Sequence, residues 1–72
     1  MRQGTVVRWV NSYGFIRPRV RESGHGDIFV HAGDVAGCGV LSVGDEVEYE
    51  VGYDYGGRRR AVRVIRTDRM AA

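Results

Sequence analysis

The sequence predicts an all-β fold, a small closed barrel of five short antiparallel strands in a single domain. Three observations indicate this fold: the chain has only 72 residues, 11 of them are glycine, and no stretch shows a long helical period. Frequent glycines between short β-forming runs are typical of strands joined by tight turns. Five strands this short cannot build two broad sheets, and closing them into a barrel removes their open edges.

The five expected strands are separated by turn signals. They cover residues 3–11, 13–17, 27–31, 46–53 and 58–65. Pro18 should end the second strand because proline has no backbone N–H to donate, and Gly56 with Gly57 should make the last hairpin turn. Residues 32–42 contain three glycines and no clear period, so we expect a loop there, with one helical turn near residues 33–36.

The fourth strand has the clearest alternation of apolar and acidic residues. Val47, Tyr49 and Val51 alternate with glutamates, which is the pattern of a strand buried on one face. Tyr49 is therefore expected in the core. Tyr53 and Tyr55 flank the last hairpin and are expected to pack along the edge of the barrel, and the alternative is that they contact a ligand.

Aromatic residues alternate with aliphatic or small ones in two neighbouring strands. The two stretches are Tyr13-Gly14-Phe15-Ile16 and Asp27-Ile28-Phe29-Val30-His31. Successive side chains of a strand point to opposite faces, so each stretch has one aromatic and one aliphatic face. The five-stranded barrel that binds oligonucleotides on its second and third strands is the OB-fold.

The aromatic faces could belong to the core, which is the commoner place for such rings, or to an exposed binding surface. The aliphatic faces already suffice for a small core, and histidine, here His31, is usually not fully buried. Arg8 and Arg17 also sit next to Trp9 and Ile16 in the sequence. We therefore expect the rings to be exposed and to form a platform on which unpaired bases stack.

The net charge of +2 is small, but the charges are unevenly distributed. Residues 1–21 and 55–72 hold all 11 basic residues, every one an arginine, whereas residues 22–54 hold eight of the nine acids. If the two ends of the chain meet in space, one surface is basic and can contact phosphates. The alternative is a solubilising surface of mixed charge.

Composition excludes several other classes of function. A single cysteine, Cys38, allows no internal disulfide and fits a reducing compartment. No apolar run is long enough for a membrane span or a secretion signal. His25, Asp27 and His31 match no zinc pattern, and no third group positions Cys38 against a histidine for nucleophilic catalysis. We expect a cytoplasmic monomer with no metal, cofactor, small-molecule substrate, membrane partner or enzymatic activity.

Several segments, taken in order, resemble the cold shock domain family. Arg8-Trp9-Val10-Asn11 is similar to the family's Lys-Trp-Phe-Asn, and the two aromatic stretches are similar to its Lys-Gly-Phe-Gly-Phe-Ile and Asp-Val-Phe-Val-His-Phe. Residues 41–47 and 57–64 resemble its Leu-x-x-Gly-x-x-Val and Gly-x-x-Ala-x-x-Val. The similarity covers nearly the whole chain, so residues 1–67 are expected to form the domain and residues 68–72 a disordered tail.

The resemblance implies an OB-fold barrel that binds single-stranded RNA or DNA, with an RNA-chaperone or gene-regulatory role. Together with the arginines, it gives an expected nucleic-acid site of Arg8, Trp9, Asn11, Tyr13, Phe15, Arg17, Phe29, His31, Arg58 and Arg60. The preference between RNA and DNA stays open, because stacking treats both alike.

The sequence also departs from the family pattern. The turn after Asn11 is shorter and lacks the family's lysine, and Val10, Ala32 and Val40 stand where relatives have aromatic residues. The loop over residues 17–26 is longer and rich in arginine, which can compensate electrostatically for weaker stacking. The second hypothesis is a barrel whose aromatic patch docks a protein partner. A third, a small hydrolase, lacks an acid–base constellation.

Overall fold

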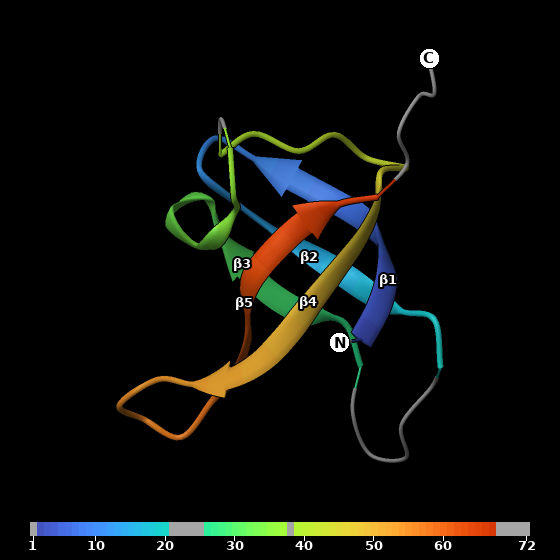
Figure 1. Ribbon diagram of the computed structural model, residues 1–72. Coiled ribbons are helices and arrows are strands. Elements are labelled where there is room, and N and C mark those ends of the chain that lie inside the picture. The colour runs from blue at the N-terminus through green and yellow to red at the C-terminus, as the bar shows by residue number, and fades with distance from the viewer. Residues whose placement is uncertain (1, 21–25, 38, 68–72) are drawn as a thin grey trace.

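The structure, a computed structural model, describes residues 2–20, 26–37 and 39–67. The expected disordered tail, residues 68–72, lies outside the described residues. The described chain forms five strands and one short 3₁₀ helix (Figure 1): β1 (Arg2–Val10), β2 (Tyr13–Pro18), β3 (Ile28–His31), η1 (Ala32–Asp34), β4 (Glu46–Tyr53) and β5 (Arg59–Arg66). The predicted strand ends differ from these by at most one residue. Pro18 is the last residue of β2, where its missing N–H costs little.

The five strands close into a barrel in the order β1-β2-β3-β5-β4, which confirms the predicted fold class. The β1–β2, β1–β4, β2–β3 and β4–β5 pairs are antiparallel. The β3–β5 pair is parallel, with Phe29 opposite Arg60 and Val30 opposite Ala61. A closed ring with an odd number of strands cannot alternate in direction all the way round, so one parallel pair is required.

The barrel interior is filled by the aliphatic faces of the strands, as the alternation predicts. The buried core consists of Val6, Ile16, Ile28, Val30, Val35, Leu41, Val47, Tyr49, Ala61 and Val64. Tyr49 has no exposed surface, which confirms its expected place in the core. With the interior filled in this way, the outward faces of β2 and β3 are not needed for the core.

The prediction for Tyr53 and Tyr55 was wrong. Tyr53 is 67% exposed and Tyr55 is fully exposed, so neither packs along the barrel edge. The β4–β5 hairpin extends beyond the body of the barrel (Figure 1), where no further strand covers it. Side chains at its tip are therefore largely exposed to solvent.

Candidate nucleic-acid interface

The outward faces of β2 and β3 bring four ring side chains together. Tyr13 lies directly opposite His31, and Phe15 lies directly opposite Phe29. Directly opposite residues in a strand pair point to the same face, and their sequence neighbours point into the core. We call these four side chains, Tyr13, Phe15, Phe29 and His31, the aromatic face.

The three phenyl rings of the aromatic face contact one another. The Tyr13 and Phe29 rings stack with centroids 5.9 Å apart and planes at 28°. Phe15 meets Phe29 edge to face at 5.9 Å, and it meets Tyr13 edge to face at 6.5 Å. Tyr13 is 38% exposed, and Phe15 and Phe29 are half-buried. The rings therefore hold each other in place while part of their surface stays open to solvent.

His31 is held at the edge of the aromatic face by a backbone hydrogen bond. It caps η1, and the backbone N–H of Gly33 donates to its Nδ1 over 2.9 Å. When Nδ1 of a neutral imidazole accepts, the proton is on Nε2. The Ala32 N–H donates to the Ser12 carbonyl oxygen over 2.7 Å, which ties η1 to the β1–β2 turn. His31 thus presents an oriented Nε2–H donor beside the rings.

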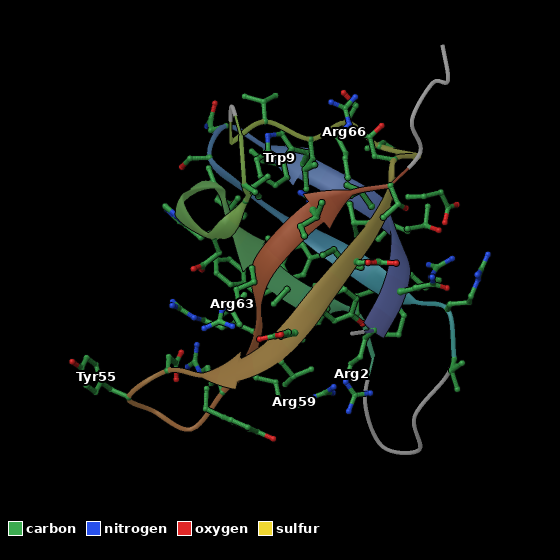
Figure 2. All side chains as sticks on the ribbon, viewed as in Figure 1. Arg2, Trp9, Tyr55, Arg59, Arg63 and Arg66 are labelled. Atoms are coloured by element: carbon green, nitrogen blue, oxygen red, sulfur yellow. The ribbon has the colours of Figure 1, made fainter. Side chains whose placement is uncertain are left out.

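A β-bulge sets the directions of the first-strand residues. The β1–β2 register shifts between Val6 and Arg8, so Val7 is an extra residue in β1. Arg8 comes to lie opposite Phe15, and its exposed side chain is on the side of the aromatic face. Trp9 lies opposite Gly14 instead, and it packs half-buried against the core. Figure 2 shows Trp9 near the end of β1, and the ring contacts of the aromatic face described above do not include it.

The glycine opposite Trp9 has a steric reason. A Cβ atom added to Gly14 would lie 2.5 Å from the Cε3 atom of Trp9 and even closer to the carbonyl oxygen of Arg8. Only glycine lets β1 and the indole ring approach β2 this closely. The glycine between Tyr13 and Phe15 therefore serves to place the Trp9 ring.

Asn11 and the positions that depart from the family pattern have different surroundings in the structure. Asn11 has a φ of 55°, in the left-handed region that asparagine tolerates better than most residues, and it forms the tight β1–β2 turn. Val10 lies opposite Tyr13, and Ala32 opens η1 half-buried. Val40 is exposed. Asn11 thus has a backbone role in the turn apart from any ligand contact.

Two of the predicted arginines form ion pairs on the rim of the aromatic face. Arg17 Nε lies 3.6 Å from Asp27 Oδ1, and Arg60 lies 3.6 Å from Asp34 Oδ2. Ion pairs at a protein surface contribute little to stability. Because Arg60 is directly beside Phe29 in the parallel β3–β5 pair, its guanidinium can reach a phosphate next to the rings.

The β4–β5 hairpin adds a second group of arginines to this face. A hollow of about 400 Å³ is lined by Phe15, Phe29, Asp54, Arg58, Arg59 and Arg60. The structure thus brings the predicted Arg58 and Arg60 to the two phenylalanines. The run Arg58-Arg59-Arg60 indicated either a phosphate contact, which we favoured, or a solvated shoulder of the hairpin, and the expected site left out Arg59. Asp54, also part of this wall, was not predicted.

Asp54 fixes the shape of the hairpin loop. Its Oδ1 atom accepts hydrogen bonds from the backbone N–H groups of Gly56 and Arg58, each over 2.9 Å. The hydrogen bond from the Arg58 N–H is the largest cause of the lowered pKa of Asp54, and the charges of Arg58 and Arg60 lower it further. Gly57 has a φ of 80°, which favours glycine in the same loop.

The described residues contain neither a cluster of metal ligands nor a membrane-spanning helix. Across residues 2–20, 26–37 and 39–67, the histidines and acidic side chains form no group of three or more that could hold a metal ion. His25 and Cys38, which the sequence analysis considered, lie outside the described residues. In the same ranges, no helix has the length and apolar character needed to span a bilayer.

The closed five-stranded barrel with a ring-lined face on β2 and β3 defines an OB-fold with the features of an oligonucleotide-binding surface. The chain belongs to the cold-shock family: residues 2–67 match the 'Cold-shock' DNA-binding domain. This confirms the resemblance seen in the sequence. The family binds nucleic acids and is not a family of enzymes.

Two mycobacterial proteins and one solved structure illustrate the similarity. The chain is 41% identical over 58 residues to "Probable cold shock protein A" of Mycobacterium tuberculosis, covering 74% of this chain and 81% of that protein. It is 44% identical over 57 residues to the protein of the same name in Mycolicibacterium smegmatis, covering 72% and 79%. The structure titled "drosophila Unr CSD456" superposes with a TM-score of 0.75 at 25% identity, over 99% of this chain and 28% of that one.

Proposed function

We propose that this chain binds single-stranded RNA or DNA by stacking unpaired bases on the aromatic face and by contacting phosphates with the arginines around it. The observation that carries the proposal is the cluster of mutually packed, partly exposed rings of Tyr13, Phe15 and Phe29, with arginines on its rim. In a duplex the faces of the bases are already stacked. Only an unpaired strand offers free base faces to such a surface.

Each predicted site residue has a role in this proposal. Tyr13, Phe15, Phe29 and His31 form the stacking surface, and we assign the exposed part of Trp9, near the end of β1, to the same site. The contacts to phosphate come from Arg8, Arg17, Arg58 and Arg60. Asn11 shapes the turn that joins the first two strands, and its exposed side chain borders the path of the ligand.

The biological role follows from the selectivity for unpaired strands. A protein that binds only the unpaired state shifts weak secondary structure toward that state by mass action, without catalysis. We infer an RNA-chaperone or gene-regulatory role of the cold shock type, carried out by a monomer in the cytoplasm. The same physics applies to RNA and single-stranded DNA.

Trp9 fluorescence tests the proposal directly, because Trp9 is the single tryptophan of the chain. A pyrimidine-rich single strand should quench its emission strongly, and a duplex of the same sequence should have little effect. Equal responses to strand and duplex would contradict the stacking proposal. A surface built for a protein partner would bind oligonucleotides weakly or with no salt dependence, whereas binding through phosphates weakens steeply with salt.

A further inference from the structure

The tip of the β4–β5 hairpin exposes two aromatic rings that the proposed stacking surface does not use. Tyr53 is 67% exposed and Tyr55 is fully exposed. Figure 2 shows Tyr55 at the tip of the hairpin, directed away from the barrel. A lone exposed ring needs no explanation, but these two lie together beside a hollow.

That hollow joins the tyrosines to the aromatic face. It has a volume of about 390 Å³ and is lined by Tyr53, Asp54, Tyr55 and Arg60. Asp54 and Arg60 also line the hollow at Phe15 and Phe29. The two hollows therefore adjoin at Asp54 and Arg60, so the phenylalanines and the hairpin tyrosines line neighbouring parts of the surface.

The charge along this surface suits a polyanion. Arg58, Arg59 and Arg60 are consecutive in the chain, and all three line the hollow between the phenylalanines and the hairpin. Asp54 is the acid in this wall, and its Oδ1 atom already accepts two hydrogen bonds from the loop backbone. A strand crossing the wall thus meets three arginines, of which Arg60 also lies 3.6 Å from the Asp34 carboxylate.

We infer that the hairpin carries an additional stacking subsite for the same nucleic-acid strand. The inference depends on the proposed function: a strand seated on Phe15 and Phe29 continues across the three arginines and places a further base against Tyr53 and Tyr55. The favoured ligand is a single strand rather than a protein segment, because the subsite adjoins the aromatic face and its approach is positively charged.

Oligonucleotides of two lengths distinguish binding at the subsite from binding at the aromatic face alone. We would measure the affinity of wild type, Tyr53→Ala, Tyr55→Ala and the double variant for oligothymidines of about four and about eight nucleotides, within the range of OB-fold site sizes. The double alanine variant should bind the longer strand about 5- to 10-fold more weakly than wild type, which corresponds to the loss of one modest stack. The shorter strand should bind all four proteins equally.

Tyr53→Phe and Tyr55→Phe are the matched controls, since they keep the rings and should bind both strands like wild type. Because both tyrosines are exposed, the alanine variants should unfold at the wild-type temperature. As an independent readout, an eight-nucleotide strand carrying 5-iodouracil at either end should crosslink on irradiation to Tyr53 or Tyr55.

The possible failures are distinguishable. If the alanine variants bind the longer strand as tightly as wild type, or lose equal affinity for both lengths, the subsite does not exist and the proposed function stands. Crosslinks that map only to the barrel would also overturn the inference. If wild type binds neither strand, the proposed function itself fails.

Discussion

Phe15 on β2 and Phe29 on β3 lie directly opposite each other, and their rings meet edge to face with centroids 5.9 Å apart and planes at 73°. Tyr13 closes the group by stacking on Phe29. Aromatic pairs in such geometries are favourable beyond the area that they bury. The rings are thus arranged before any ligand arrives, which reduces the entropy lost when a base stacks on them.

Phe15→Ala and Phe29→Ala should each weaken the binding of a single strand by roughly 1–3 kcal/mol, because each removes a stacking ring. The double variant should lose less than the sum of the two, since the rings contact each other and each supports its neighbour. Titrations of Trp9 fluorescence with one oligonucleotide measure all three affinities.

Val47→Ala is the control for this pair. Val47 is 1% exposed in the core, so its truncation leaves a cavity and lowers the free energy of unfolding. Affinity measured well below the unfolding transition should stay near the wild-type value. If a phenylalanine variant unfolds while Val47→Ala is tolerated, the two faces of the strands have been assigned the wrong way round.

Arg8→Gln and Arg58→Gln should weaken binding and make it less sensitive to salt. Each phosphate contact to a single strand contributes about −0.7 to the slope of log affinity against log salt concentration. The slope of each variant should therefore be less negative than that of wild type by about 0.7. Affinities at four or five salt concentrations give the slopes.

Arg66→Gln removes the same charge at another place and is the matched control. Arg66 pairs with Asp45 over 3.4 Å, and it lies about 20 Å along β5 from Arg60 by the rise of a strand. The salt-dependence slope of Arg66→Gln should equal that of wild type. Equal losses in all three variants would mean that net charge, rather than contact at the aromatic face, governs binding.

The barrel could be predicted from the sequence because its signals are local. The alternation around Tyr49 and the glycine pair at the last hairpin indicated strands and turns without knowledge of their partners. The parallel β3–β5 pair was not predicted, although closing an odd number of strands requires it. The exposure of Tyr53 and Tyr55 depends on how far the hairpin extends past its neighbours, which is a property of the assembled barrel.

The rings of the candidate site were also predictable, whereas the arrangement of its other groups was not. Alternation placed Tyr13 with Phe15 and Phe29 with His31, and the aliphatic residues on the opposite faces indicated that both pairs point outward. The bulge at Val7 could not be predicted, because a run of β-forming residues does not indicate where an extra residue lies. The ion pair between Arg17 and Asp27 and the wall formed by Asp54 join segments that come together only in the folded barrel.

Arg63 gives a test of the strain in β5. It has a φ of 54°, where the β4–β5 register shifts, in a region that non-glycine residues other than asparagine rarely adopt. Arg63→Gly should raise the free energy of unfolding by up to about 1 kcal/mol, because glycine has no Cβ to strain there. Arg63→Val should lower it by about 1–2 kcal/mol, since β-branched residues tolerate this conformation poorly. Urea denaturation measures both.

Arg63→Gln controls for the ion pair between Arg63 and Glu50, whose atoms lie 3.4 Å apart. It removes the charge and keeps the Cβ atom, and an exposed pair contributes at most about 1 kcal/mol. Its stability should therefore lie between those of the glycine and valine variants. A glycine variant less stable than the glutamine variant would show that the left-handed backbone at this position carries no strain.

Acid should loosen the β4–β5 loop only below the ordinary pKa of an aspartate. The N–H groups of Arg58 and Gly56 donate to Asp54 and lower its pKa in the folded chain from the usual 3.8. A lowered folded-state pKa means that this contribution to stability is complete above 3.8 and is lost as the pH falls through the lower folded value. The amide shifts of Gly56 and Arg58, followed by NMR, should be constant from neutral pH to about 4 and should change with a midpoint below 3.8.

Asp54→Asn is the control, because it keeps an acceptor oxygen but has no carboxylate to protonate. In this variant the amide shifts of Gly56 and Arg58 should show no such step. A wild-type midpoint at or above 3.8 would show that these hydrogen bonds do not hold the carboxylate in solution.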